Sequence, residues 1–267
     1  MCLLVLAWQA HPRYRLVVAA NRDEYHERPA AALAKWPDAP LIAGRDLRAQ
    51  GTWLGLDRGR RFAVVTNFRE LQRPRAAAPS RGGLIPQYLT GTAGPREFLT
   101  TLEPQAGGYA GFNLLLADGA TLAYGSNRTT PFARELPPGV YGLSNELLDT
   151  PWPKLQRVRA GFEEWLRSAP ATAAGLFTLL NDRRQAGSDA NAAGTGGLPH
   201  EWQQVLSAPF VLHPVYGTRC STVVLLEPDG AVYLAERRFD ASGEPGGETE
   251  FRLNAADWPS APRPVPR

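Results

Sequence analysis

Residues 1–24 read MCLLVLAWQAHPRYRLVVAANRDE and hold two apolar runs separated by a polar turn. The runs cover residues 3–8 and 15–20, and His11-Pro12 lies between them. Short apolar runs on either side of a turn predict two neighbouring antiparallel strands. The polar residues 21–24 follow directly, so we expect them at a strand end, where polar side chains often line a site.

The same pattern recurs along the chain. We predict further strands at 52–56, 61–66, 112–117, 121–124, 140–144, 218–226 and 232–239. Helical spacing and a Pro at a first helical position predict helices over 83–90, 95–102, 153–167 and 171–180. Hairpins with a few helices between them predict a single α+β domain over 1–267, with layered antiparallel sheets.

Three segments are expected to lack regular structure. Residues 21–50 are polar and contain three prolines, so we expect a loop there. Residues 183–199 are rich in Gly, Ala, Asn and Asp and lack aromatic residues, which favours a flexible loop. From about residue 240 the chain is rich in Pro and Gly, and we expect a tail with one short strand near Phe251.

Composition excludes several classes of protein. The 267 residues are 43% apolar and 21% charged, which is ordinary globular composition. No stretch approaches 18 apolar residues, so we expect a cytoplasmic protein without a transmembrane segment. The net charge is only +3, and the basic residues form no cluster, so no nucleic acid is expected as a partner. The 27 Arg against 2 Lys are typical of a GC-rich genome.

The two cysteines, Cys2 and Cys220, form no metal-binding or redox pair motif. Two cysteines are enough for one disulfide bridge, although a reducing cytosol disfavours it. Cys2 follows the initiator Met, and removal of Met1 would leave a thiol beside its own α-amine. The α-amine titrates near pH 7.7–8.0 and can take the thiol proton, so Cys2 is a candidate nucleophile. The alternative is a small residue that opens a buried strand.

Polar residues follow other predicted strands. Asn67, Asn145 and Arg219 each lie beside an apolar run, and amide N–H groups suit an oxyanion hole. An Arg near Cys2, such as Arg22, would lower the pKa of its thiol, and a carboxylate such as Asp23 would orient the α-amine. The alternatives are turn residues and a solvated loop with a local ion pair.

The four histidines show no metal-ligand spacing, and the HExxH motif is absent, so no metal is expected. The GxSxG motif is also absent, which disfavours an α/β-hydrolase.

The sequence resembles the NRDE family, also called the transport and Golgi organisation protein 2 family. The resemblance runs in order through residues 1 to about 226, and its matching segments are 1–8, 21–24, 51–55, 66–69, 80–82, 143–154 and 216–223. The family in turn is similar to N-terminal-nucleophile hydrolases such as penicillin V acylase and bile-salt hydrolase. This similarity implies a four-layer αββα sandwich of two antiparallel sheets.

The resemblance also implies roles for residues. It implies that Cys2 is the nucleophile, Asn67 an oxyanion donor, Asn145 a second Asn near the α-amine, and Arg219 the late Arg of those hydrolases. Arg22 and Asp23 stand at the positions where those hydrolases have an Arg and an Asp beside the nucleophile. The Asn-Arg-Asp-Glu order departs from their Arg-x-x-Asp spacing, so Asn21 or Asp23 is an alternative to Arg22.

Two functions follow as expectations. The first is a hydrolase or acyltransferase in which Cys2 attacks an amide or thioester of a small-molecule substrate, with no cofactor required. The second, which the family resemblance implies, is a non-catalytic carrier of haem, acyl-CoA or lipid. A haem carrier needs an apolar slot and an axial ligand, for which Cys2, Cys220, His26 and His213 are available.

Overall fold

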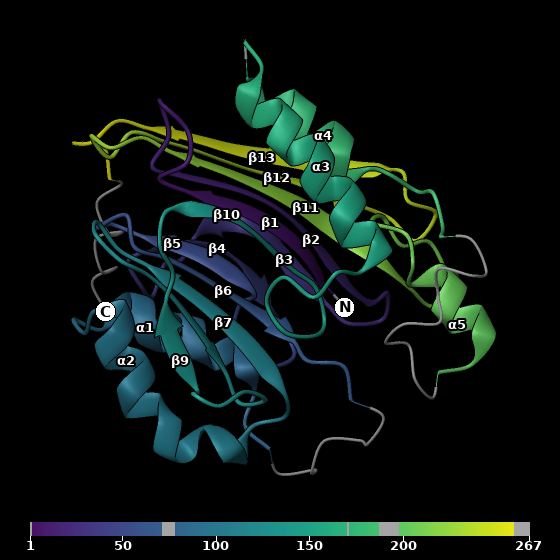
Figure 1. Ribbon diagram of the computed structural model, residues 1–267, viewed down its shortest axis with the longest axis horizontal. Coiled ribbons are helices and arrows are strands. Elements are labelled where there is room, and N and C mark those ends of the chain that lie inside the picture. Colours follow the sequence, from purple (N-terminus) through teal and green to yellow (C-terminus); the bar gives the residue numbers. More distant parts are fainter. Residues whose placement is uncertain (1, 71–77, 170, 187–197, 259–267) are drawn as a thin grey trace, which may run out of the picture.

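The computed structural model describes residues 2–70, 78–169, 171–186 and 198–258. Two antiparallel sheets lie face to face, and helices cover their outer faces (Figure 1). The first sheet has the order β10-β1-β2-β11-β12-β13, with bounds Gly139–Leu143, Cys2–Trp8, Leu16–Tyr25, Tyr216–Leu226, Val232–Phe239 and Pro245–Leu253. The second sheet has the order β3-β4-β5-β6-β7-β8-β9. Its strands have the bounds Ala30–Lys35, Leu41–Asp46, Leu54–Asp57, Phe62–Asn67, Phe112–Ala117, Leu122–Ser126 and Ala133–Glu135, in the same order.

Helices α3 and α4 cover the first sheet, and α1 and α2 cover the second (Figure 1). Their bounds are Pro153–Arg167, Ala173–Leu180, Leu84–Thr90 and Pro95–Leu102, respectively, and α5 spans His200–Val205. The short 3₁₀ helices η1 and η2 span Arg81–Gly83 and Glu103–Gly108. The predicted αββα sandwich is therefore confirmed.

Three apolar layers follow from the alternation of side chains along the strands. Leu4 and Val18 of the first sheet pack against Phe62 and Leu115 of the second, between the sheets. The neighbouring residues on the first two strands point the other way and pack against α3 and α4. A third layer joins the second sheet to α1 and α2. Burying one large apolar side chain contributes about 1.5–3 kcal/mol, so these layers provide much of the stability.

The predicted loop over 21–50 is wrong. Strand β2 continues through Tyr25, so residues 21–24 lie inside a strand, and β3 and β4 occupy Ala30–Lys35 and Leu41–Asp46. Strand β3 lies at a sheet edge and buries mainly Leu33, so its sequence lacks an apolar pattern. The polar side chains of Asn21 and Asp23 are tolerated inside the sheet because protein groups, rather than water, form hydrogen bonds with them.

The other unstructured segments have different outcomes. The expected short strand near Phe251 is the nine-residue edge strand β13, which pairs with β12. Of the predicted loop at 183–199, residues 187–197 lie outside the described residues, and the rest contains neither helix nor strand. No helix among the described residues is long and apolar enough to span a membrane.

Candidate functional site

The strand register brings the N-terminus and the NRDE segment together. Strand β2 lies between β1 and β11, and Arg22 is paired with Cys2 on one side and with Cys220 on the other. Two strand spacings of about 4.8 Å separate the two cysteine Cα positions by roughly 10 Å. A disulfide needs less than about 7 Å, so the register excludes the bridge that the sequence allowed.

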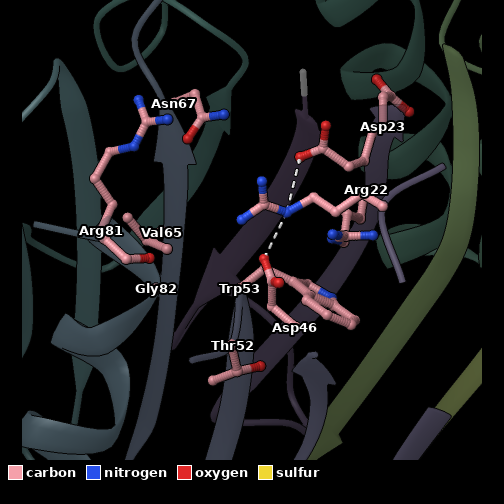
Figure 2. Close-up of a pocket in the computed structure, with 12 residues that line it drawn as sticks. Arg22, Asp23, Asp46, Thr52, Trp53, Val65, Asn67, Arg81 and Gly82 are labelled. Atoms are coloured by element: carbon pink, nitrogen blue, oxygen red, sulfur yellow. Dashed lines mark hydrogen bonds and ion pairs between the residues drawn. The ribbon is translucent and has the colours of Figure 1, made fainter. Parts of the chain in front are cut away.

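A cleft of about 110 Å³ opens at this end of the sheets (Figure 2). Residues 22–24 of β2 form one wall, and Asn67 and Arg81 lie together on the opposite wall. Most of the lining side chains are charged or polar. Those lining residues are Arg22, Asp23, Glu24, Arg28, Asp46, Thr52, Trp53, Val65, Asn67, Ser80, Arg81 and Gly82.

Asn21 is buried outside this cleft. Its Nδ2 donates to the carbonyls of Leu180 (2.8 Å) and Pro209 (3.0 Å), and its Oδ1 accepts from Ser221 Oγ at 2.6 Å. The Asn21 amide is thus bonded to the end of α4, to the segment before β11 and to β11 itself. Asn21 therefore joins the first sheet to its helical layer, and it is not among the residues that line the cleft.

Asp23 lies at the cleft and is 2% exposed. Its Oδ1 accepts a hydrogen bond from Thr218 Oγ1 at 2.7 Å. Burial raises the pKa of Asp23, because removal from water penalises the carboxylate, whereas Lys154, Thr218 and Arg22 act in the opposite direction. The Asp23 carboxyl is thus a buried titratable group on β2, the strand next to β1, which carries the candidate nucleophile Cys2.

Arg22 is 6% exposed and stacks on Trp53, with its guanidinium carbon 4.3 Å from the ring centroid. The indole in turn lies against Gly44 of β4, where an added Cβ would come within 2.3 Å of Trp53 Cζ2. The second sheet, through Trp53 beside β5 and Gly44 in β4, therefore holds the guanidinium of Arg22, which comes from the first sheet. A cation–π contact of this kind contributes about 0.5–2 kcal/mol.

Replacing Gly44 with alanine is expected to displace the Trp53 indole and loosen its stack with Arg22, because the new methyl group overlaps the ring. Overpacking of this kind costs about 1–3 kcal/mol of unfolding free energy. Urea denaturation measures the loss, with Gly107→Ala as a matched control, since an added Cβ there meets nothing within 4 Å. Equal losses for both variants would contradict the prediction.

Asn67 and Asn145 have different places. Asn67 lines the cleft at the end of β6, and its side chain makes no hydrogen bond to the described residues. Asn145 Nδ2 donates to the backbone carbonyl of Asn67 at 2.8 Å, so Asn145 holds the end of β6 and does not line the cleft. Asn113 in turn donates to the carbonyl of Glu146 at 2.8 Å and fixes the 144–148 turn.

Arg219 lies at a β-bulge, where the register of β11 against β2 shifts between Thr218 and Cys220. Its Nη1 donates to the carbonyls of Tyr25 (3.0 Å) and His26 (2.9 Å). Burial, and then the charge of Arg22, lower the pKa of Arg219. Arg219 thus secures the end of β2 and adds positive potential near Arg22, but it is not among the residues lining the cleft.

Sequence reasoning missed several residues at this end of the sheets. Lys154, one of the two lysines, is 2% exposed at the start of α3 and acts on the Asp23 carboxyl. Its position four residues before Val158, on the apolar face of the helix, was an available signal. Arg28 and Asp46 reach the cleft from segments that the sequence assigned to a loop, so no pattern indicated them.

Glu236 is another buried residue that the sequence did not indicate. Its Oε1 accepts from the backbone N–H of Leu33 at 2.8 Å, which connects β12 of the first sheet to β3 of the second. It also accepts a hydrogen bond from the thiol of Cys220. Burial raises the pKa of Glu236 above its usual range, and the Leu33 and Cys220 contacts, together with Arg238 and Arg22, oppose that shift.

Glu236→Gln is expected to make the protein less sensitive to pH above about 4.5, the usual glutamate range. A carboxyl whose pKa is raised on folding binds more protons in the folded state, so the wild type loses stability as pH rises through this window. Glutamine stays neutral and still accepts from Leu33. Thermal unfolding at several pH values should show the variant gaining on the wild type as pH rises above about 4.5, and parallel curves would contradict this.

The cleft lined by Arg22 does not match the apolar slot that a haem carrier needs. The cleft is polar, and its volume of about 110 Å³ is well below that of pockets enclosing drug-sized ligands. The thiol of Cys220 is bonded to Glu236, and His26 Nε2 lies 3.0 Å from the carbonyl of His213. The described residues also contain no group of three or more His, Cys, Asp or Glu that could hold a metal ion.

Comparisons with known proteins agree with this architecture. The fold is similar to that of the C2A mutant of conjugated bile acid hydrolase from Clostridium perfringens, with a TM-score of 0.52 over 97% of this chain and 94% of that chain. The sequence identity is 8%, so this similarity concerns the fold alone. The expected resemblance to N-terminal-nucleophile hydrolases is confirmed at that level.

Sequence relatives match nearly the whole chain. A Transport and Golgi organization protein 2 homolog of Bos taurus is 35% identical over 96% of this chain and 100% of its own length. The Homo sapiens homolog is 33% identical over 89% of this chain and 92% of its own. The model of the family described as Transport and Golgi organisation 2 matches residues 1–241. The chain belongs to the Transport and Golgi organisation 2 family.

Proposed function

We propose that this protein is an N-terminal-nucleophile hydrolase or acyltransferase that acts on an amide or thioester through Cys2. The observation that supports the proposal is the strand register, which pairs Cys2 with Arg22, and Arg22 lines a cleft together with Asp23 and Asn67. The structure of conjugated bile acid hydrolase is that of its C2A mutant, in which the cysteine at position 2 is replaced, and this chain also has Cys2.

The proposed reaction begins once Met1 has been removed. The free α-amine takes the proton of the Cys2 thiol, and the thiolate attacks the substrate carbonyl. Asn67 Nδ2 and a backbone N–H stabilise the oxyanion. The carbonyl then re-forms, the amine or thiol leaving group departs with the proton, and an S-acyl enzyme remains. Water or another acceptor attacks this thioester, releases the acyl group and regenerates the thiol.

Arg22 and Asp23 have supporting roles in this proposal. The charge of Arg22 favours the thiolate form of the nucleophile, because a nearby cation lowers a thiol pKa. The buried Asp23 carboxyl orients the α-amine. Asn21, Asn145 and Arg219 act indirectly, since their hydrogen bonds hold the ends of the strands and helices that carry the cleft.

The test is mass spectrometry after brief, substoichiometric alkylation at pH about 6, where an ordinary thiol of pKa about 8.5 stays protonated. The expected result is a chain without Met1 whose Cys2 is labelled much faster than Cys220. Cys220 is a built-in control, since it is 4% exposed and bonded to Glu236. A retained Met1, or a Cys2 no faster than Cys220, would overturn the proposal.

The carrier hypothesis remains a prediction and has its own test. Micromolar haem added to the purified chain would give a Soret band if an axial ligand is available. A band that disappears in one variant at Cys2, Cys220, His26 or His213 would favour a haem carrier.

A further inference from the structure

The cleft holds arginine N–H groups that its own acids do not use. Arg22 forms no ion pair and no hydrogen bond with the described residues, and its Nη1 is buried without a partner there. Trp53 covers one face of its guanidinium at 4.3 Å. Guanidinium N–H groups point outward in the plane of the group, so the N–H edge of Arg22 remains available to a ligand although Trp53 covers one face. A buried cation without an acceptor is costly, which indicates that a ligand supplies one.

Arg28 adds a second donor edge. Its Nε donates to Asp46 Oδ2 at 2.8 Å and lies 4.0 Å from Glu24 Oε2. Its two terminal nitrogens make no hydrogen bond to the described residues, and its side chain is 25% exposed at the cleft. One side of Arg28 is therefore held by protein acids, and the other is open to a ligand.

The acids of the cleft are occupied by protein groups. Asp46 accepts from Arg28 and, through Oδ1, from the backbone N–H groups of Arg48 and Ala49 at 3.0 Å each, and these bonds lower its pKa despite burial. Glu24 Oε1 accepts from the N–H of Tyr25 at 2.9 Å. Asp23 is buried, bonded to Thr218, and has a raised pKa. The positive edges of the arginines consequently dominate what a ligand meets.

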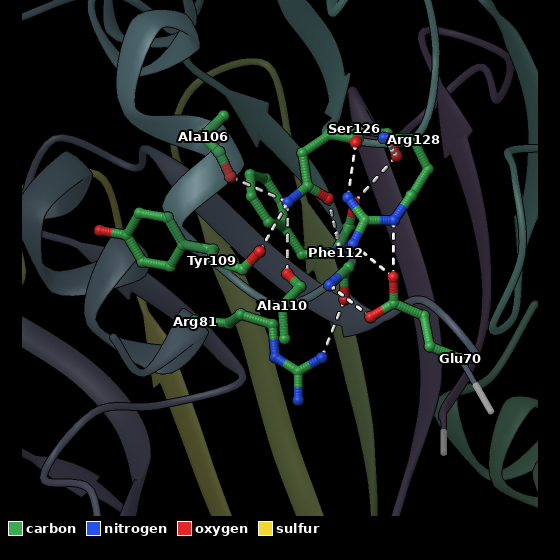
Figure 3. Close-up of polar contacts among 10 residues, drawn as sticks. Glu70, Arg81, Ala106, Tyr109, Ala110, Phe112, Ser126 and Arg128 are labelled. Atoms are coloured by element: carbon green, nitrogen blue, oxygen red, sulfur yellow. Dashed lines mark hydrogen bonds and ion pairs between the residues drawn. The ribbon is translucent and has the colours of Figure 1, made fainter. Parts of the chain in front are cut away.

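Arg81, on the opposite wall, is held in place by a network of its own (Figure 3). Its Nη1 donates to the carbonyl of Gly111 at 2.8 Å, and the N–H of Gly111 donates to Glu70 Oε2 at 3.0 Å. Glu70 is in turn paired with Arg128. The Arg81 guanidinium is thus fixed at the cleft beside Asn67 (Figure 2).

We propose that this cleft binds an oxyanion, a carboxylate or a phosphate, between Arg22, Arg28 and Arg81. Its volume of about 110 Å³ suits one charged end of a ligand rather than a whole drug-sized molecule. The ligand is then an anionic amide or thioester, with its carbonyl at Cys2 and its charged group against the arginines. This substrate class rests on the proposed function, whereas anion binding by the cleft does not.

Calorimetric titration of the full chain with benzoate, phenyl phosphate and the neutral benzamide tests the anion site. We expect at least one anion to bind at least tenfold more tightly than benzamide, and the better anion tells whether a carboxylate or a phosphate is the ligand group. The double variant Arg28→Gln, Arg81→Gln should lose this preference. Equal binding of all three probes, or an unchanged preference in the variant, would overturn the proposal.

Two further variants separate binding from folding. Arg96→Gln, on the exposed face of α2, is the matched charge control and should bind like the wild type. Arg81→Lys keeps the charge without the planar donor fork and should give intermediate binding. Thermal unfolding of every variant shows whether the fold is retained, and the Arg81→Lys result decides the matter if the double variant does not fold.

Alkylation rates connect the anion site to Cys2. Iodoacetate is an anion and iodoacetamide is neutral, and the two reagents differ mainly in this charge. The ratio of the iodoacetate rate to the iodoacetamide rate at Cys2 should therefore exceed the same ratio for glutathione. In the double variant the Cys2 ratio should fall to the glutathione value. If Cys2 reacts fast but its ratio of iodoacetate to iodoacetamide rates equals that of glutathione, the anionic substrate class is contradicted and the proposed function is not. Anion binding with an inert Cys2 would sink the proposed function while the anion site stands.

Discussion

Cys2→Ala is expected to abolish turnover of any amide or thioester substrate, with a fall in kcat/KM on the order of 10⁴-fold or more. The variant removes the only atom that can form the S-acyl intermediate in the proposed reaction. Its fold should be intact, because residues 3–8 of β1 supply the packing that holds this strand between β10 and β2. The measurement is the initial rate on a panel of acyl p-nitroanilides and acyl thioesters, together with thermal unfolding.

Two controls make this result specific. Cys2→Ser keeps an N-terminal nucleophile of lower reactivity and should retain a small rate above that of Cys2→Ala. Cys220→Ala removes the other thiol, which is buried and bonded to Glu236, and should leave the rate nearly unchanged. Turnover by Cys2→Ala at the wild-type rate would rule out the nucleophile assigned here.

Asp23→Asn should lower kcat/KM by about 10²-fold, the usual loss when a group that positions the reacting atoms is removed. Asparagine can still accept the hydrogen bond from Thr218, so the shape of the site is kept and only the charge beside Lys154 and Arg22 is lost. Because burial raises the pKa of Asp23, wild-type activity should fall as pH decreases through that raised value, and the variant should lack this step. A pH–rate profile for both proteins measures it.

Thr218→Val is the matched control for Asp23. It removes the hydrogen bond to Asp23 Oδ1 and the acceptor of the Val211 N–H but leaves the carboxyl group, so the loss of kcat/KM should be smaller, about tenfold. Since that hydrogen bond lowers the Asp23 pKa, its removal should move the acidic step of the profile to higher pH. An Asp23→Asn enzyme as active as Thr218→Val would show that the charge has no role.

Much of the framework was predictable because it depends on local patterns. The 3–8 run became β1, and the helical spacing over 153–167 matches α3 at both ends. Apolar periodicity and turn residues act over a few residues, so they can be identified without the fold. The family resemblance then extended these elements to the four-layer sandwich that the structure has.

The NRDE segment shows where such patterns fail. A run of polar residues predicts a strand end, yet β2 continues through it to Tyr25. Asn21 is satisfied by Leu180, Pro209 and Ser221, which are 159 or more positions away in the chain. Inside a sheet, distant groups can replace water as hydrogen-bond partners, and no local signal reports them.

The sequence by itself determined the strands around Cys2 and the hairpins and helices of a layered α+β fold, and its motifs indicated the family and a set of candidate polar residues. Only the tertiary structure decided how those residues are used. It put Arg22 between Cys2 and Cys220, placed Asn67 at the cleft, and gave Asn21 and Asn145 structural contacts instead. The reason is that strand register and sheet-to-sheet packing bring together residues such as Asn21 and Ser221, 200 positions apart, whose proximity no short-range periodicity encodes.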